Sequence, residues 1–270
     1  MLRGFENTSP DGLVALGERA FGRPVRHFQV DYHFARKGLT PDGIVATTPS
    51  PQPFGVSWLK STCKHLAGWP WAPYRPDLHA ELAYTPARPD VVCFLAIRPS
   101  RPGRGGCTAI CDGRELLRRL SPATVRLFRE RRLRYTIEHE AKPRWTLRSL
   151  SHLSRGDDSA ILTYFHPNER TNQGTNRLVH VTDAIVRDLS GAEAFCNSIL
   201  AYRGALTFED GSRIPADVLS ELLETSARIH VAHEYLANDV LMLDNSRCMH
   251  AGDWNTDPHR LVGMAMYNLS

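Results

Sequence analysis

The segment Asp77-Leu78-His79-Ala80-Glu81 contains the first residues whose types and spacing suit catalytic chemistry. On an extended strand, residues two apart point to the same side, so we expect His79 and Glu81 to project together. A neutral nitrogen and an anionic oxygen suit a divalent metal such as Fe(II), and they supply two-thirds of a two-histidine, one-carboxylate triad. With 12 histidines and 29 acidic residues in the chain, about one such pair is expected by chance. Taken alone, the pair is better explained as a surface histidine beside a solvated carboxylate.

A second segment, Asp244-Asn245-Ser246-Arg247-Cys248-Met249-His250, is followed ten residues later by Arg260. A buried strand that runs into an Asp-Asn turn can deliver His250 as a third ligand. Arg260 on the next strand can bind a carboxylate through two parallel hydrogen bonds, as a dicarboxylic co-substrate requires. The alternatives are a core histidine bonded to a backbone carbonyl and an arginine in a surface ion pair.

The elements that must position these residues follow from periodicity, capping residues and proline. Ser121-Pro122 predicts a helix start, and the apolar run 91–97 predicts a strand buried on both faces. Proline recurs from 47 to 102, which excludes a long helix there. The predicted helices span 13–21, 112–120, a segment from 121 onward, 183–202 with a break near Gly191, and 215–230. The predicted strands span 25–34, 91–97, 133–138, 160–165, 240–243 and 261–267.

This order favours a mainly β fold with helices (α+β). Strands come first, an α-rich insert follows over about 112–230, and further strands close the chain. The pattern fits a regular βαβ alternation poorly and fits a β-sandwich or jelly roll with external helices better. A length of 270 residues suits a single domain over 1–270.

The composition narrows the class of protein. Hydrophobic residues make up 42% and charged residues 23% of the chain, which excludes a disordered chain. No apolar run is long enough to span a bilayer and no signal peptide is evident, so we expect a cytoplasmic protein without a membrane partner. The 33 basic and 29 acidic residues nearly balance, which gives no indication of nucleic-acid binding. Eleven arginines between 114 and 155 are interpreted as solvated helix faces, with an acidic carrier protein as the alternative partner.

Together, these motifs resemble those of the taurine dioxygenase and clavaminate synthase-like superfamily of Fe(II)- and 2-oxoglutarate-dependent oxygenases. The resemblance rests on four motifs in the same order and extends from about Pro76 to the C-terminus. They are His79-Ala80-Glu81, the phrase Glu81-Leu82-Ala83-Tyr84-x-Pro86-x-x-Pro89, Gly105-Gly106-Cys107-Thr108, and Asp244-Asn245-x-Arg247-x-x-His250 with Arg260.

The resemblance implies a double-stranded β-helix, or jelly roll, with an iron site at its open end. It implies that His79, Glu81 and His250 are the iron ligands. Arg260 is implied to bind the distal carboxylate of 2-oxoglutarate, with the hydroxyl of Thr108 beside it. 2-Oxoglutarate would occupy two further coordination positions and O2 the last. The expected reaction begins with hydrogen abstraction from an unactivated C–H bond and ends in hydroxylation, desaturation or cyclisation, with succinate and CO2 as co-products.

Two differences within the resemblance bear on the substrate. Many relatives have a second arginine where this chain has Met264, which disfavours a sulfonate such as taurine. Glu81 is present where halogenating relatives have a small residue, which favours oxygen chemistry. Substrate contacts are predicted for Trp71, Tyr84 and Trp145, although an aromatic residue near a barrel rim is more often part of the core. The expected substrate is small, such as an amino acid derivative or natural-product intermediate, free or attached to a carrier protein.

Two other functions remain open from the sequence. A non-catalytic jelly-roll binding protein would keep the fold without turnover. A metal hydrolase could use the same triad, but it would have no use for Arg260 and Thr108.

Overall fold

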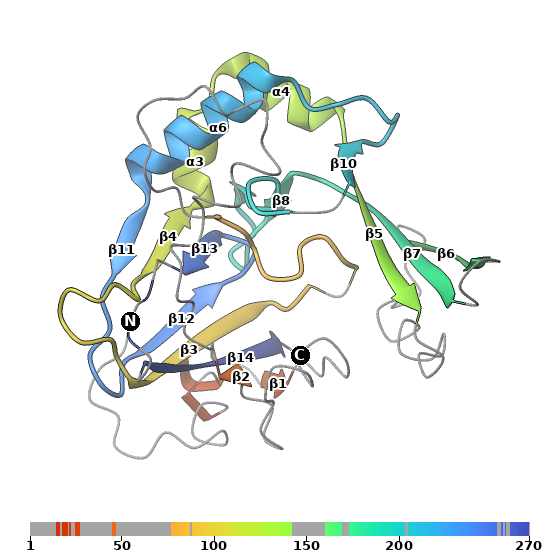
Figure 1. The fold of residues 1–270 in the computed structure, drawn as a ribbon. Helices are drawn as coiled ribbons and strands as arrows, with labels where there is room; N and C mark the ends of the chain where they lie inside the picture. The colour runs from red at the N-terminus through yellow and green to blue at the C-terminus, as the bar shows by residue number, and fades with distance from the viewer. Residues whose placement is uncertain are drawn as a thin grey trace.

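We describe a computed structural model of the chain, which is a mixed α/β structure with many strands and few helices (Figure 1). It describes residues 15–16, 18–20, 22, 25–27, 45–46, 77–86, 88–141, 160–168, 173–202, 205–252, 255, 257 and 260–269. Its strands are β1 (Val25–His27), β2 (Val45–Ala46), β3 (Val91–Arg98), β4 (Thr108–Asp112), β5 (Leu133–Ala141), β6 (Ala160–Asn168), β7 (Gln173–Thr182), β8 (Ile185–Arg187), β9 (Glu193–Phe195), β10 (Ala205–Phe208), β11 (Val231–His233), β12 (Val240–Asp244), β13 (Cys248–Gly252) and β14 (Leu261–Leu269). Its helices are α3 (Gly113–Arg119), α4 (Pro122–Glu130) and α6 (Ala216–Ile229), and residues 15–16 and 18–20 are also helical.

The larger sheet has the antiparallel strand order β1-β14-β3-β12, with β2 also paired to β14. Side chains alternate across it, as the two-residue period of a strand requires. Val92 and Phe94 of β3 pack in one apolar cluster, whereas Val91 and Cys93 pack in another with Tyr267 on the opposite face. The prediction that this segment is a strand buried on both faces is confirmed over 91–96.

The smaller sheet has the order β11-β4-β13 and is also antiparallel. His250 pairs with Ile110, and Gly252 pairs with Thr108. Ile110 and Cys248 pack against the apolar cluster of the larger sheet, so this face of the smaller sheet faces the larger one. The ring of Phe94 contacts the ring of His250 edge-on, with centroids 5.1 Å apart. His250 therefore points between the two sheets.

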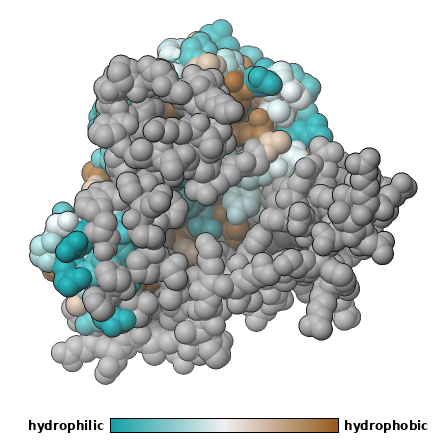
Figure 2. Space-filling model, viewed as in Figure 1, coloured by the Kyte–Doolittle hydropathy of each residue, from teal (hydrophilic) through white to brown (hydrophobic). Residues whose placement is uncertain are grey.

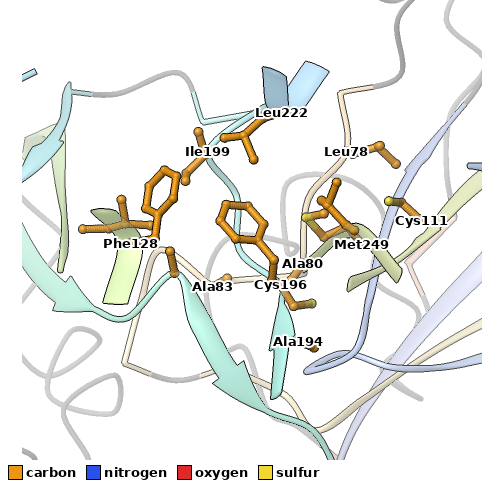
Figure 3. Close-up of a cluster of buried hydrophobic side chains, with 14 of the residues drawn as sticks. Leu78, Ala80, Ala83, Cys111, Phe128, Ala194, Cys196, Ile199, Leu222 and Met249 are labelled. Carbon is orange, nitrogen blue, oxygen red and sulfur yellow. The ribbon is translucent and has the colours of Figure 1, made fainter. Parts of the chain in front are cut away.

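The helices cover the opposite face of the smaller sheet. Cys111 and Met249 of that sheet lie in one buried cluster with Phe128 of α4 and Leu222 of α6 (Figure 3). Helix α4 begins where the sequence predicts, because the side chain of Ser121 accepts a hydrogen bond from the amide of Thr124 and Pro122 occupies the first turn. The exposed sides of this helical layer form hydrophilic surface (Figure 2). Within the described residues, no helix is both long and apolar enough to cross a membrane.

The region 112–230 is less helical than we expected from the sequence. It contains the three labelled helices, but also a four-stranded sheet of order β10-β5-β7-β6 and the strand pair β8–β9. The predicted helix over 183–202 is wrong. Asp188 accepts hydrogen bonds from the amides of Ser190 and Ala192, and Gly191 has a φ of +85°. This turn connects β8 to β9 as a hairpin, because a glycine with positive φ favours a reversal of the chain over a continued helix.

Candidate metal centre

His79 is attached to β13 by the backbone. The amide of His79 donates to the carbonyl of His250 at 3.0 Å, and the amide of His250 donates to the carbonyl of His79 at 2.8 Å. Leu78 and Ala80 are buried in the cluster beneath the helices, so the side chains of His79 and Glu81 point the other way, toward His250. The predicted shared orientation holds, although the backbone is extended only near His79. Residues 81–84 form a turn in which Leu82 has a φ of +53°.

The side chains of His79, Glu81 and His250 converge on one point. Their candidate ligand atoms all lie within 4.8 Å of one another, and among the described residues they form the only such group of histidine, cysteine or acidic side chains. One Glu81 carboxylate oxygen lies 3.6 Å from Nε2 of His79 and 3.7 Å from Nε2 of His250. The His250 side chain is 4% exposed and that of His79 is 30% exposed, so the group is open on the His79 side.

The electrostatics of the site keep Glu81 ionised and His250 neutral, which are the forms in which these groups bind a metal. Burial alone would raise the pKa of Glu81, but the adjacent imidazoles of His250 and His79 hold it well below its usual range. Burial lowers the pKa of His250 below its usual value. Burial also opposes a charge on His79, but Glu81 outweighs it and raises that pKa. The Nδ1 atom of His79 lies 2.8 Å from the carbonyl oxygen of Asp77. Nδ1–H can therefore donate there, which leaves Nε2 for the metal. Two imidazole nitrogens and one carboxylate fit Fe(II).

Asn245 fixes the backbone of Glu81 from below the site. Its side chain is fully buried and makes three hydrogen bonds. Its Oδ1 accepts from the amide of Glu81 at 2.8 Å, and its Nδ2 donates to the carbonyls of Glu81 at 2.9 Å and Pro89 at 2.8 Å. The guanidinium of Arg88 in turn donates to the carbonyl of Asn245. The motif Asp244-Asn245 therefore supports the carboxylate ligand, a role that the sequence analysis did not assign to it.

Arg260 immediately precedes β14 and lies beside the glycine pair that precedes β4. Its Nη2 donates to the carbonyl of Gly106 at 3.0 Å. Gly106 has a φ of +92°, and a Cβ atom there would lie 2.8 Å from Nε of Arg260 and 2.2 Å from Oγ of Ser100. Only glycine leaves room for the arginine at this point. The Arg260 loop is also held by Asp257, whose carboxylate forms an ion pair with Arg101.

Thr108 is buried at the start of β4, and its Oγ1 lies 2.8 Å from the hydroxyl of Tyr235. Thr108 and His250 share the face of the smaller sheet that points toward the larger sheet, since Thr108 is two residues from the strand partner of His250. The sequence analysis missed Tyr235. Tyr235 follows β11, whose last residue His233 pairs with Thr108. Only this strand pairing could have indicated that Tyr235 lies beside Thr108.

The predicted substrate contacts are only partly described. Trp71 and Trp145 lie outside the described residues. Tyr84 is half-buried next to the site, with its ring 5.3 Å from that of Tyr202. Burial, together with the nearby charge of Glu81, raises the pKa of Tyr84 to about 12. It is therefore a neutral phenol close to the carboxylate ligand.

Comparison with protein families identifies the chain. Residues 1–267 match the model described as "Taurine catabolism dioxygenase TauD, TfdA family". The chain belongs to the TauD/TfdA family. Members of this family are Fe(II)- and 2-oxoglutarate-dependent dioxygenases.

One solved structure resembles the chain at the level of the fold, and others match it less closely. A Burkholderia xenovorans chain, provisionally described as an alpha-ketoglutarate-dependent taurine dioxygenase, matches with a TM-score of 0.53 at 13% identity, covering 97% of this chain and 73% of that one. PvcB from Pseudomonas aeruginosa matches with a TM-score of 0.47 at 14% identity, covering 86% and 66%. Asparagine oxygenase with Fe(II), 2S,3S-3-hydroxyasparagine and succinate matches with a TM-score of 0.42 at 19% identity, covering 71% and 49%. The chain thus spans about half the length of asparagine oxygenase. No curated protein sequence matches it.

Proposed function

We propose that this protein is an Fe(II)- and 2-oxoglutarate-dependent oxygenase that attacks an unactivated C–H bond of a small molecule. The observation that carries the proposal is that the fold brings His250, which is distant in the sequence, to His79 and Glu81 at one point that suits a divalent metal. In this proposal the two facing antiparallel sheets are the halves of a double-stranded β-helix, and 1–270 is one oxygenase domain.

His79, Glu81 and His250 would hold the iron, and Arg260 with Thr108 would bind the distal carboxylate of 2-oxoglutarate. Together with 2-oxoglutarate and O2, bound iron would supply the oxidising power to abstract hydrogen, and succinate and CO2 would be released. The residues of the chain do the positioning. The carbonyl of Asp77 orients the His79 ring through Nδ1, so that Nε2 would be available to a bound metal. Glu81 occupies the position that a halide would need, which favours oxygenation over halogenation.

The substrate in this proposal is an amino acid derivative or a natural-product intermediate that enters beside Tyr84, with Trp71 and Trp145 as further contacts. Met264 supports the exclusion of a sulfonate, because it is buried in the apolar cluster between the sheets. The outcome can be hydroxylation, desaturation or cyclisation, since all three start with the same hydrogen abstraction. A cytoplasmic location remains a prediction from the sequence.

A carrier-bound substrate is less well supported than a free one. Among the described residues, six of the arginines expected to meet an acidic carrier form ion pairs within the chain, as Arg129 does with Glu193 and Arg132 with Glu209. Such pairs reduce the positive field that would attract a carrier protein. Turnover of a carrier-bound substrate that falls steeply with added salt, at a rate that the free small molecule does not reach, would reverse this preference.

An anaerobic titration tests the proposed function. Metal-free protein is titrated with Fe(II) and then with 2-oxoglutarate while the visible absorption spectrum is recorded. A weak metal-to-ligand charge-transfer band is expected in the wild type and is expected to be absent in His79→Ala. A folded, iron-loaded wild type without this band contradicts 2-oxoglutarate binding at iron. Metal-dependent hydrolysis would then favour the hydrolase, and lack of any turnover would favour the binding protein.

A further inference from the structure

A pair of hydroxyl groups is buried between the two sheets. Oγ1 of Thr108 and the hydroxyl oxygen of Tyr235 are 2.8 Å apart, and the two residues are 4% and 8% exposed. Tyr235 belongs to the apolar cluster between the two sheets, together with Phe94 and Met264. Buried hydroxyls in such surroundings are costly unless their hydrogen-bonding capacity is used.

The pair has capacity left over. Each hydroxyl carries one proton, and the hydrogen bond between Thr108 and Tyr235 uses only one of the two. Among the described residues, neither hydroxyl has a second hydrogen-bond partner. One proton donor therefore remains for a group that is not part of the described chain.

A positive charge lies close to this donor. The charge of Arg260 acts on the Tyr235 hydroxyl and favours its ionisation, but burial outweighs it and raises the pKa of Tyr235 to about 12. The phenol is therefore protonated at neutral pH and is able to donate. Arg260 is held here by its bond to the carbonyl of Gly106, where the absence of a Cβ makes space for its side chain. Gly106 is two residues before Thr108, so the Arg260 cation and the remaining hydroxyl proton lie in the same region, where together they suit a carboxylate, which accepts several hydrogen bonds.

We propose that Tyr235 is a specificity-determining residue that helps Arg260 and Thr108 bind the distal carboxylate of the 2-oxo acid. This inference rests on the proposed function, because it assigns a residue to its co-substrate pocket. Tyr235 favours a dicarboxylic acid over a monocarboxylic acid of the same length. The phenol does not contact the metal and is not a catalytic residue.

Two ligands of equal chain length isolate this contact. 2-Oxoglutarate carries the distal carboxylate, whereas 2-oxovalerate has a methyl group in its place. Their binding to the Mn(II)-loaded protein is measured by calorimetry, which does not depend on turnover. Tyr235→Phe is expected to weaken 2-oxoglutarate binding roughly tenfold or more, the usual effect of losing a hydrogen bond to a charged group. It is expected to leave 2-oxovalerate binding unchanged.

Tyr267→Phe is the matched control. Tyr267 is also buried, but it packs on the outward face of the larger sheet, away from the cluster that contains Tyr235. Its variant should bind both acids as the wild type does. Thr108→Val is the second test variant and should show the same selective loss as Tyr235→Phe. Thermal melting establishes that each variant is folded.

The outcomes separate the inference from the function on which it rests. A selective loss of 2-oxoglutarate affinity in Tyr235→Phe supports the inference. Unchanged affinity, or an equal loss for both acids, overturns it and leaves Tyr235 a structural partner of Thr108. If Tyr235→Phe does not fold, Thr108→Val decides the question. An equal effect of Thr108→Val on 2-oxoglutarate and 2-oxovalerate binding would then overturn the inference. If the Mn(II)-loaded wild type does not bind 2-oxoglutarate at all, the proposed function itself fails.

Discussion

The side chain of Asn245 offers a direct test of how the metal centre is built. It is fully buried and makes three hydrogen bonds, two of them to the backbone of Glu81. Asn245→Ala removes all three and leaves the amide and carbonyl of Glu81 without these partners. The candidate carboxylate ligand then loses the side-chain support of its own peptide groups.

The expected effects are large enough to measure. A buried hydrogen bond contributes about 1 kcal/mol to the free energy of unfolding, so three lost bonds predict a destabilisation of about 3 kcal/mol. Loss of a group that orients a metal ligand lowers metal affinity by about 10- to 100-fold. Chemical denaturation of the metal-free protein measures the first effect, and calorimetric titration with Mn(II) measures the second.

Asn197→Ala is the matched control. Asn197 is also buried, but its side chain bonds to the carbonyl of Ala184 and the amide of Ile199 rather than to a ligand. We expect it to destabilise the fold by about 2 kcal/mol without changing metal affinity. Wild-type Mn(II) affinity in folded Asn245→Ala would refute the reasoning. An equal loss of affinity in Asn197→Ala would show that the effect on the metal is not local.

Four further predictions concern the site and the fold. His79→Ala is expected to abolish metal-dependent turnover while leaving the metal-free protein folded, as measured by activity and melting. Arg260→Ala should raise the KM for 2-oxoglutarate about 10- to 100-fold with a smaller change in kcat, as steady-state kinetics will show. Gly106→Ala should lower the free energy of unfolding by about 1–3 kcal/mol, because the φ of Gly106 is +92° and a Cβ atom there would meet the Arg260 side chain. Chemical denaturation measures this loss, and 2-oxoglutarate binding should weaken as well. Burial opposes ionisation of Asp188, but hydrogen bonds from Ser190 and Arg114 outweigh it and lower its pKa. The ionised Asp188 carboxylate therefore stabilises the fold fully above the ordinary carboxyl pKa of about 4, and this stabilisation is lost as pH falls further. The melting temperatures of wild type and Asp188→Asn should then converge in acid.

Much of the candidate site follows from strand geometry. The shared direction of His79 and Glu81 follows from their two-residue spacing, and His250 follows from its place after a buried strand and an Asp-Asn turn. The structure brings these three residues together. Arg260 and Thr108 were indicated by the resemblance, and the structure places both near Tyr235.

The remainder depended on tertiary pairing that the local sequence does not encode. The segment 183–202 has enough apolar residues to suggest a helix, but Asp188 and Gly191 turn it into a hairpin. Tyr235 gave no signal because its partner Thr108 is distant in the sequence and approaches it only through the pairing of β11 with β4. The support of Glu81 by Asn245 likewise joins residues 164 positions apart.

The order of the ligands along the chain has a consequence for the biosynthesis of the protein. His79 and Glu81 precede the region 112–230, whereas His250 and Arg260 follow it. The N-terminal segments of a protein leave the ribosome first. A growing chain therefore carries only two of the three ligands until His250 has emerged, and its β13 strand is not yet available to pair with His79. If the proposed function holds, a growing chain can bind iron through all three side chains only after His250 has been synthesised.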